Sequence, residues 1–124
     1  MAEKISIGAK LKAIRDLVEV DVSDCEVDDV EKHGKRLAAI IGLSAETMAD
    51  AKKRLDLRLL QAIKQLEGKN YPPSVLLKLA QAECAEEAAT YDYADRLNAG
   101  ITHQLDFYRS VLSKYKAELE NSLK

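Results

Sequence analysis

Side chains suited to catalysis or metal binding are few in this sequence and lie far apart. The two histidines, His33 and His103, belong to no HExxH, HxH or mixed Cys/His pattern, and such spacings are what a bound metal ion requires. Cys25 and Cys84 are far from the CxxC spacing of metal and redox sites. We therefore expect no metal, no cofactor and two reduced structural thiols.

Paired carboxylates are the other groups that could do chemistry. Asp28–Asp29 and Glu86–Glu87 are adjacent pairs, and neighbouring positions on a helix point about 100° apart, so the carboxylates of a pair diverge instead of meeting at one reacting bond. The sequence also contains no GxxxxGK[ST], GxGxxG or GxSxG motif, which leaves phosphate-loop, dinucleotide and serine-hydrolase chemistry without support. We expect a protein that is not an enzyme.

One line of polar side chains is a candidate binding site. At 100° per residue, its five members fall within about 20° of one direction on a helix. Arg can bind phosphate through two parallel hydrogen bonds, Tyr offers a ring for stacking, and Asn and Thr can bond to base or sugar edges. The line is either a site for a nucleotide-like anion or a partner, or an ordinary polar border of a helix. Its members are Tyr91, Asn98, Thr102, Arg109 and Lys116.

An apolar stripe runs along the same segment, about 90° from the polar line. Its members are three or four residues apart, which is the pattern of a coiled-coil seam. Residues that flank such a seam come close to a second chain, so both chains of an oligomer could contribute to one pocket. We expect this seam to associate with another copy of the chain; it consists of Leu97, Ile101, Leu105, Tyr108, Leu112, Tyr115 and Leu119.

The helix that carries both stripes is expected to be very long. Residues 75–121 contain no proline and a single glycine, Gly100, and a continuous helix of this length spans roughly 70 Å. A compact globule of this size is about half as wide, so the helix must either project from its own chain or break at Gly100. We favour a continuous helix whose 97–121 half associates with itself; the alternative is a compact bundle of four or five helices with a hairpin at Gly100.

Three shorter helices are expected before it, within residues 1–70, packed on the 75–95 part of the long helix. Apolar residues recur every three or four positions in each of them. Gly34 lies on the apolar stripe of the second, where it costs about 1 kcal/mol relative to Ala unless another helix packs closely there. The expected helices cover residues 4–20, 24–41 and 45–67.

Local signals mark the ends of these helices. Ser23-Asp24-Cys25-Glu26 matches a capping box at the start of the second helix. Gly42 can end that helix in a left-handed conformation, and Ser44 can cap the third. The run Gly68-Lys69-Asn70-Tyr71-Pro72-Pro73 predicts a firm turn, after which Ser74 would cap the long helix. We expect one helical domain, residues 1–124, with the long helix in residues 74–121.

Composition supports a packed all-α chain. Of 124 residues, 47% are hydrophobic and 32% charged, and 19 basic against 21 acidic residues give a net charge of −2. This balance is typical of folded helical proteins and opposes strong nucleic-acid binding. The N-terminal residues lack the apolar stretch of a signal peptide, and no run is long enough to cross a membrane, so we expect a cytoplasmic protein.

Two stretches, residues 35–55 and 91–119, resemble small all-helical accessory proteins of undescribed function encoded in tailed-phage and prophage genomes. The resemblance lies in the G-L-S-A-E-T and Y-P-x-S turns and in R-L-N-x-G-I-x-H and Y-R-S-x-L-S-x-Y-K-x-E on the long helix. It implies an early or accessory phage protein in the bacterial host cytoplasm, acting against host defence or assisting phage DNA recombination. The resemblance transfers no catalytic residues.

Two leading functions remain open from the sequence, and a purely structural assembly protein is the third alternative. The first is a non-enzymatic, homo-oligomeric binding protein that sequesters a host-defence protein or a nucleotide-like ligand. The second is an accessory protein of phage DNA replication or recombination that acts through protein contacts. The two differ in their response to salt, because affinity for DNA falls steeply with salt concentration, whereas a small-ligand binder gains thermal stability with its ligand.

Overall fold

The computed structural model describes residues 6–19 and 27–123 of the chain. Every regular element within these ranges is helical, so the predicted all-α class is confirmed. The last helix is long, as predicted, but two helices and not three precede the turn. The elements are α1 (Ile7–Val18), α2 (Val27–Leu66), the 3₁₀ turn η1 (Glu67–Lys69), α3 (Pro73–Glu83) and α4 (Ala85–Ser122).

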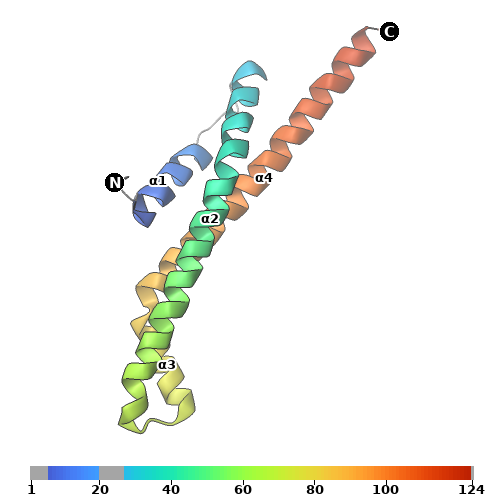
Figure 1. Ribbon diagram of the computed structural model, residues 1–124. Helices are drawn as coiled ribbons and strands as arrows, with labels where there is room; N and C mark the ends of the chain where they lie inside the picture. Colours follow the sequence, from blue (N-terminus) through green and yellow to red (C-terminus); the bar gives the residue numbers. More distant parts are fainter. Residues whose placement is uncertain (1–5, 20–26, 124) are drawn as a thin grey trace.

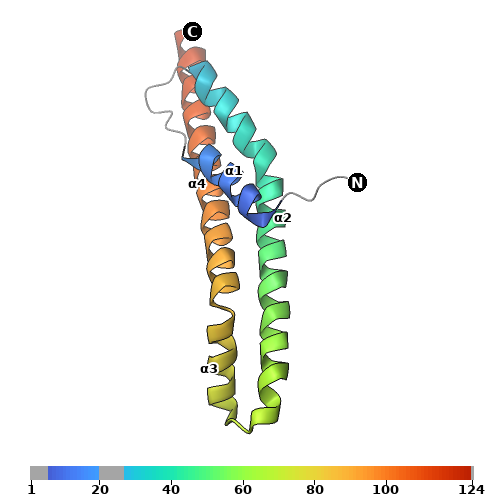
Figure 2. The same cartoon turned by 90° about the vertical axis from the view of Figure 1, so that its left-hand side faces the viewer.

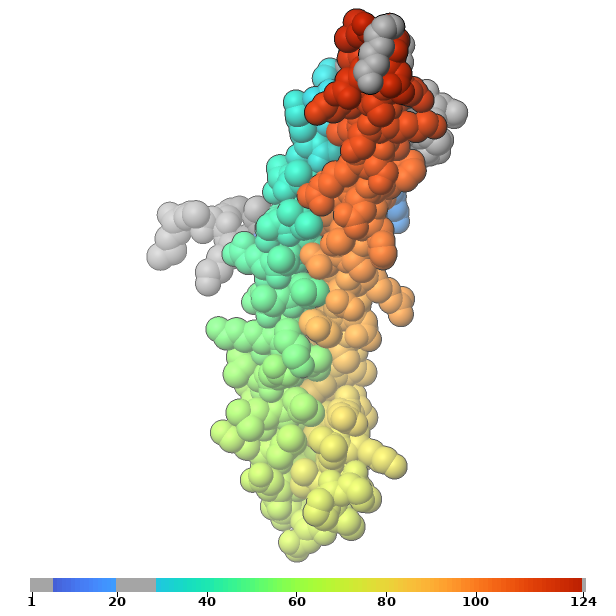
Figure 3. Space-filling view, turned by 90° about the vertical axis from the view of Figure 1, so that its right-hand side faces the viewer, coloured from blue at the N-terminus to red at the C-terminus, as the bar shows by residue number. Residues whose placement is uncertain are grey.

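α2 and α4 form a long antiparallel hairpin, and α1 lies across one side of its middle (Figures 1 and 2). Gly34, early in α2, faces Tyr108, late in α4: a Cβ built on this glycine would lie 3.7 Å from the Tyr108 Cβ. Near the closed end, Arg58 Nε is 3.9 Å from Glu87 Oε1. From the side away from α1, the two arms of the hairpin lie side by side along its length (Figure 3).

The prediction that α2 would be two helices separated at Gly42 is wrong. The helix runs from Val27 to Leu66, and no described glycine has a positive φ. Ser44, the expected N-cap, is a buried residue in the helix interior, because continuous packing against α4 outweighs the local end signals. The capping box at residues 23–26 lies outside the described residues.

The turn after α2 is confirmed, although its residues take other roles than predicted. Asn70 has the left-handed conformation, with φ 55°, which Asn tolerates better than most residues. Pro73 is the first residue of α3, where its missing N–H costs nothing. Ser74 is therefore inside the helix and not its cap, which corrects the prediction.

The long helical segment is interrupted at Cys84 and not at Gly100. Cys84 has φ −98° and ψ 14° and separates α3 from α4. Its N–H donates to the Gln81 carbonyl at 3.1 Å, and its own carbonyl accepts from Ala88 N–H at 2.9 Å. No glycine or proline marks this position, so the sequence gives no signal for it. Gly100 is inside α4, which contradicts a hairpin there.

Two apolar cores hold the hairpin together. The larger core lies where α1, α2 and α4 meet and includes Ile14, Leu37, Leu97 and Ile101. The smaller one, nearer the closed end, is built from Ala62, Leu66, Ala80 and Cys84. The long helix α4 does not stand free as predicted, because α2, with 40 residues against 38, is slightly longer and covers most of it (Figure 2).

Candidate functional site

The predicted seam divides into a covered part and an exposed part. Leu97, Ile101, Leu105 and Tyr108 are buried in the core of the chain itself, so the structure uses them internally. Beyond Tyr108 the same stripe emerges into solvent. Relative exposure rises along it, from 36% at Leu112 and 47% at Tyr115 to 63% at Leu119.

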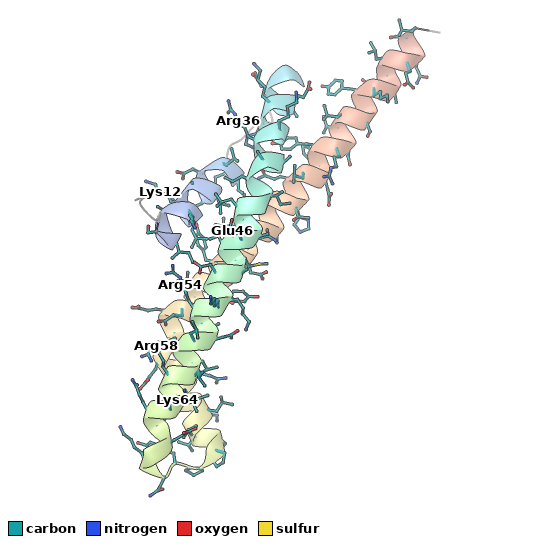
Figure 4. All side chains as sticks on the ribbon, in the orientation of Figure 1. Lys12, Arg36, Glu46, Arg54, Arg58 and Lys64 are labelled. Atoms are coloured by element: carbon teal, nitrogen blue, oxygen red, sulfur yellow. The ribbon has the colours of Figure 1, made fainter. Side chains whose placement is uncertain are left out.

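This change follows from how the two arms of the hairpin separate. Side chains of α2 and α4 interlock along the middle of the molecule, whereas at the upper end of Figure 4 the two helices draw apart. In the register set by Gly34 and Tyr108, the described start of α2 at Val27 lies near the level of Tyr115. The last two turns of α4 therefore extend beyond α2.

A groove opens where the helices separate. It has a volume of 220 Å³, and its lining includes small and apolar side chains with Glu31, Lys35 and Arg109 among them. Arg109 is exposed, and its guanidinium nitrogen lies 3.5 Å from Asp106 Oδ1, one turn earlier on the same helix. The complete lining is Glu31, Gly34, Lys35, Ala38, Leu105, Tyr108, Arg109 and Leu112.

The predicted polar line is divided by the structure and does not face one pocket. Tyr91 packs against the larger core, and the Lys52 ammonium lies 5.6 Å from its ring centroid. Asn98 is half-buried, and its Oδ1 is buried without a hydrogen-bond partner. The Thr102 hydroxyl is exposed and donates to the Asn98 carbonyl at 3.1 Å. Arg109 borders the groove, and Lys116 is exposed near the end of α4.

The division has a physical cause. When a helix packs on one partner over many turns, its buried residues repeat with a period near 3.5 residues. The polar residues lie on one line only for a period of 3.6 residues, which is that of a straight helix. The two stripes therefore converge toward the start of α4, where Tyr91 and Asn98 belong to the packed face. Only Thr102, Arg109 and Lys116 remain on the exposed flank.

Asn98 lies at a polar level of the hairpin. In the antiparallel register, Ser44 and Thr47 of α2 are opposite it, and both are buried. The Thr47 hydroxyl donates to the Leu43 carbonyl at 2.7 Å. A polar residue in such a seam fixes the register of the two helices at some cost in stability.

His33 is a buried ionisable residue that the sequence did not single out as part of a site. It is buried between the helices and packs against Tyr108, which lines the groove. Burial is the main cause that lowers its pKa from the usual 6.5, and Arg36 adds to the lowering, whereas the neighbouring Gln104 side chain raises the pKa. The Gln104 amide also donates to the Val18 carbonyl, which ties α4 to the end of α1.

A second hollow lies beside the start of α4. It has a volume of 150 Å³, and the two carboxylates predicted to diverge, Glu86 and Glu87, both border it together with Arg54. Arg54 Nε is 3.2 Å from Asp50 Oδ2, and Arg58 is near Glu87. The first of these ion pairs lies along α2, and the second joins α2 to α4.

Within residues 6–19 and 27–123, no three His, Cys, Asp or Glu side chains gather as metal ligands would. None of the helices in these ranges has an apolar stretch long enough to cross a bilayer. Comparison of the chain with protein-family models, with curated proteins and with solved structures found no match.

Proposed function

We propose that this chain is a non-enzymatic, homo-oligomeric binding protein that associates with a second copy through the free end of α4. The proposal rests mainly on the exposure of Leu112, Tyr115 and Leu119. These residues continue the stripe that α4 uses to pack on α2. Leu112 lies at the groove where the two helices separate, Tyr115 is level with the described start of α2, and Leu119 lies beyond it. Burial of apolar surface of this kind is the main driving force of protein association.

The groove beside this end is the proposed recognition site. Arg109 and Lys35 line the groove beside apolar and small side chains, and Lys35 Nζ lies 3.3 Å from Glu31 Oε1. The exposed Arg109 guanidinium, 3.5 Å from Asp106 Oδ1, can bind a phosphate or a carboxylate. The resemblance to phage-encoded accessory proteins supports a host-defence protein or a nucleotide-like anion as the partner.

Light scattering after size exclusion tests the oligomer. We expect at least a dimer at micromolar concentration, and we expect Leu119→Lys to shift it toward the monomer because a charge would be buried in the association surface. Phe107→Lys is the matched control, because Phe107 is as exposed as Leu119, at 61% against 63%, but lies off the stripe. Both positions are exposed, so circular dichroism should show unchanged helix content.

The outcomes are distinct. Dissociation by Leu119→Lys alone supports the proposal. A parent chain that is monomeric at micromolar concentration contradicts it, as does an oligomer that Leu119→Lys leaves intact.

A further inference from the structure

We infer that the second copy packs antiparallel on the free end of α4, with Tyr115 of each chain against the partner's Leu119. This inference rests on the proposed self-association and specifies its geometry. The centre of the contact lies at Ala117, so that one two-fold axis relates the copies. Such an interface uses the same patch on both chains and closes as a dimer.

The position of α2 decides the orientation. Leu112, Tyr115 and Leu119 lie on the face of α4 that α2 covers below them, because they continue the line of Leu105 and Tyr108. In a parallel pair joined by this face, both copies of α2 would lie between the two α4 helices and hold them apart. In an antiparallel pair the two α2 helices lie at opposite ends. The partner's α4 then covers the face of α4 that lies beyond the described start of α2, along the same line as α2.

The burial of Tyr108 decides the register. The seam alternates between two heptad positions, one held by Tyr108 and Tyr115 and the other by Leu112 and Leu119. In an antiparallel coiled coil each position faces the other position on the partner helix, so the alternative registers differ by seven residues. The register that places Leu119 on the partner's Tyr108 is excluded, because Tyr108 is only 4% exposed and already packs against His33. The next register pairs Tyr115 with Leu119, and both residues have exposed surface to bury.

The separation of the helices makes room for the end of the partner. In this register, the partner's Leu123 reaches the level of Val111 and Leu112, at the mouth of the groove. Leu123 is 80% exposed in the single chain, and Leu112 borders the groove. The contact would therefore cover the most exposed leucine of the described chain together with the apolar stripe.

The charges on the free end agree with this orientation. Lys114 and Lys116 precede Ala117, and Glu118 and Glu120 follow it. An antiparallel pair brings the basic half of one helix alongside the acidic half of the other, whereas a parallel pair places like charges at the same level. All four side chains are exposed, so they favour one orientation more than they strengthen the dimer.

Disulfide trapping tests the orientation and the register. Tyr115→Cys and Leu119→Cys are made separately in a Cys25→Ser chain, with the buried Cys84 left in place. Because a disulfide needs Cα atoms about 4.4–6.8 Å apart, we expect the mixture of the two variants to form a crosslinked dimer several-fold faster than either variant alone. Rapid crosslinking of Tyr115→Cys with itself would overturn the inference.

Energy transfer gives a second readout that does not depend on disulfide geometry. Lys69→Cys places a dye at the exposed closed end of the hairpin. The antiparallel dimer separates the two dyes by about 140 Å at 1.5 Å per residue, so we expect no transfer in a sample that light scattering shows to be dimeric. Transfer in that dimer would overturn the orientation alone, whereas a monomeric sample would overturn the proposed function as well.

Discussion

The ring of His33 on α2 stands edge-on against the ring of Tyr108 on α4, with the centroids 5.6 Å apart and the planes at 82°. Both residues are buried. Tyr108 also lines the groove between the two arms of the hairpin. The contact therefore places a buried ionisable ring directly beside the groove.

His33 should make the stability of the hairpin depend on pH. Its pKa in the folded chain is lowered from 6.5, chiefly by burial, so below about pH 6.5 the unfolded chain takes up a proton that the folded chain resists. We expect the free energy of unfolding to be highest above this pH and to fall as the pH drops toward the folded pKa. Urea titrations from pH 7.5 to 5 measure it. His33→Gln should flatten the profile; an equal flattening by His103→Gln, at an exposed site, would contradict this assignment.

Gly42→Ala tests the continuity of α2. An added Cβ meets nothing within 4 Å, so we expect stabilisation by about 0.5–1 kcal/mol, as for alanine in any exposed helix interior. Gly34→Ala should gain a similar amount, because the new Cβ would lie at ordinary contact distance from Tyr108. Gly100→Ala should gain less, because its Cβ would approach Val18 Cγ1 to 3.3 Å. Destabilisation by Gly42→Ala would indicate a helix end at that residue.

Asn98→Leu should stabilise the chain. The buried Oδ1 of Asn98 lacks a hydrogen-bond partner, and removal of such a group recovers about 1 kcal/mol or more. Asn98→Asp should destabilise the chain, because it places a negative charge where even the neutral amide oxygen lacks a hydrogen-bond partner. The midpoint of urea unfolding distinguishes the two variants. If Asn98→Leu lowers it, the amide has a partner in solution.

Arg109 is the residue on which anion binding at the groove depends. If a nucleotide binds there, Arg109→Ala should remove the thermal shift that the nucleotide produces, while helix content stays constant because this side chain is exposed. Lys116→Ala, nearly two turns further along α4, should reduce the shift less. Thermal unfolding against a panel of cyclic and linear nucleotides provides the measurement. A shift that persists in Arg109→Ala would place the ligand elsewhere.

The sequence predicted the features of the fold that depend on local chemistry. The turn at Tyr71-Pro72-Pro73 and the helical periodicity on both sides of it are such features. The end predicted at Gly42 failed, because glycine is tolerated inside a helix when a long partner packs along it. The break at Cys84 could not be predicted, because neither glycine nor proline marks it; Cys84 lies buried in the smaller core with Ala62 and Ala80.

The candidate site shows the same division. The spacing of Leu97 to Leu119 correctly indicated a packing stripe, but not that α2 would cover its first four members. That required knowledge of the length of α2. The prediction placed the polar residues on a straight line along the helix, whereas a seam that packs on a partner helix winds slowly around the helix axis. His33 was considered only as a metal ligand, because the sequence does not show that this histidine is buried between two helices.

The break at Cys84 has a consequence for the motions of the chain. The backbone hydrogen bonds of α4 do not continue into α3, so α3 can open while α4 stays helical. The buried residues that hold α3 against the end of α2 are mainly small. Amide hydrogens of α3 should therefore exchange faster than those of α4 around Ile101. Burial raises the pKa of the Cys84 thiol, which keeps it unreactive while the end is closed. The rate at which iodoacetamide alkylates this thiol would then report how often the closed end of the hairpin unfolds by itself.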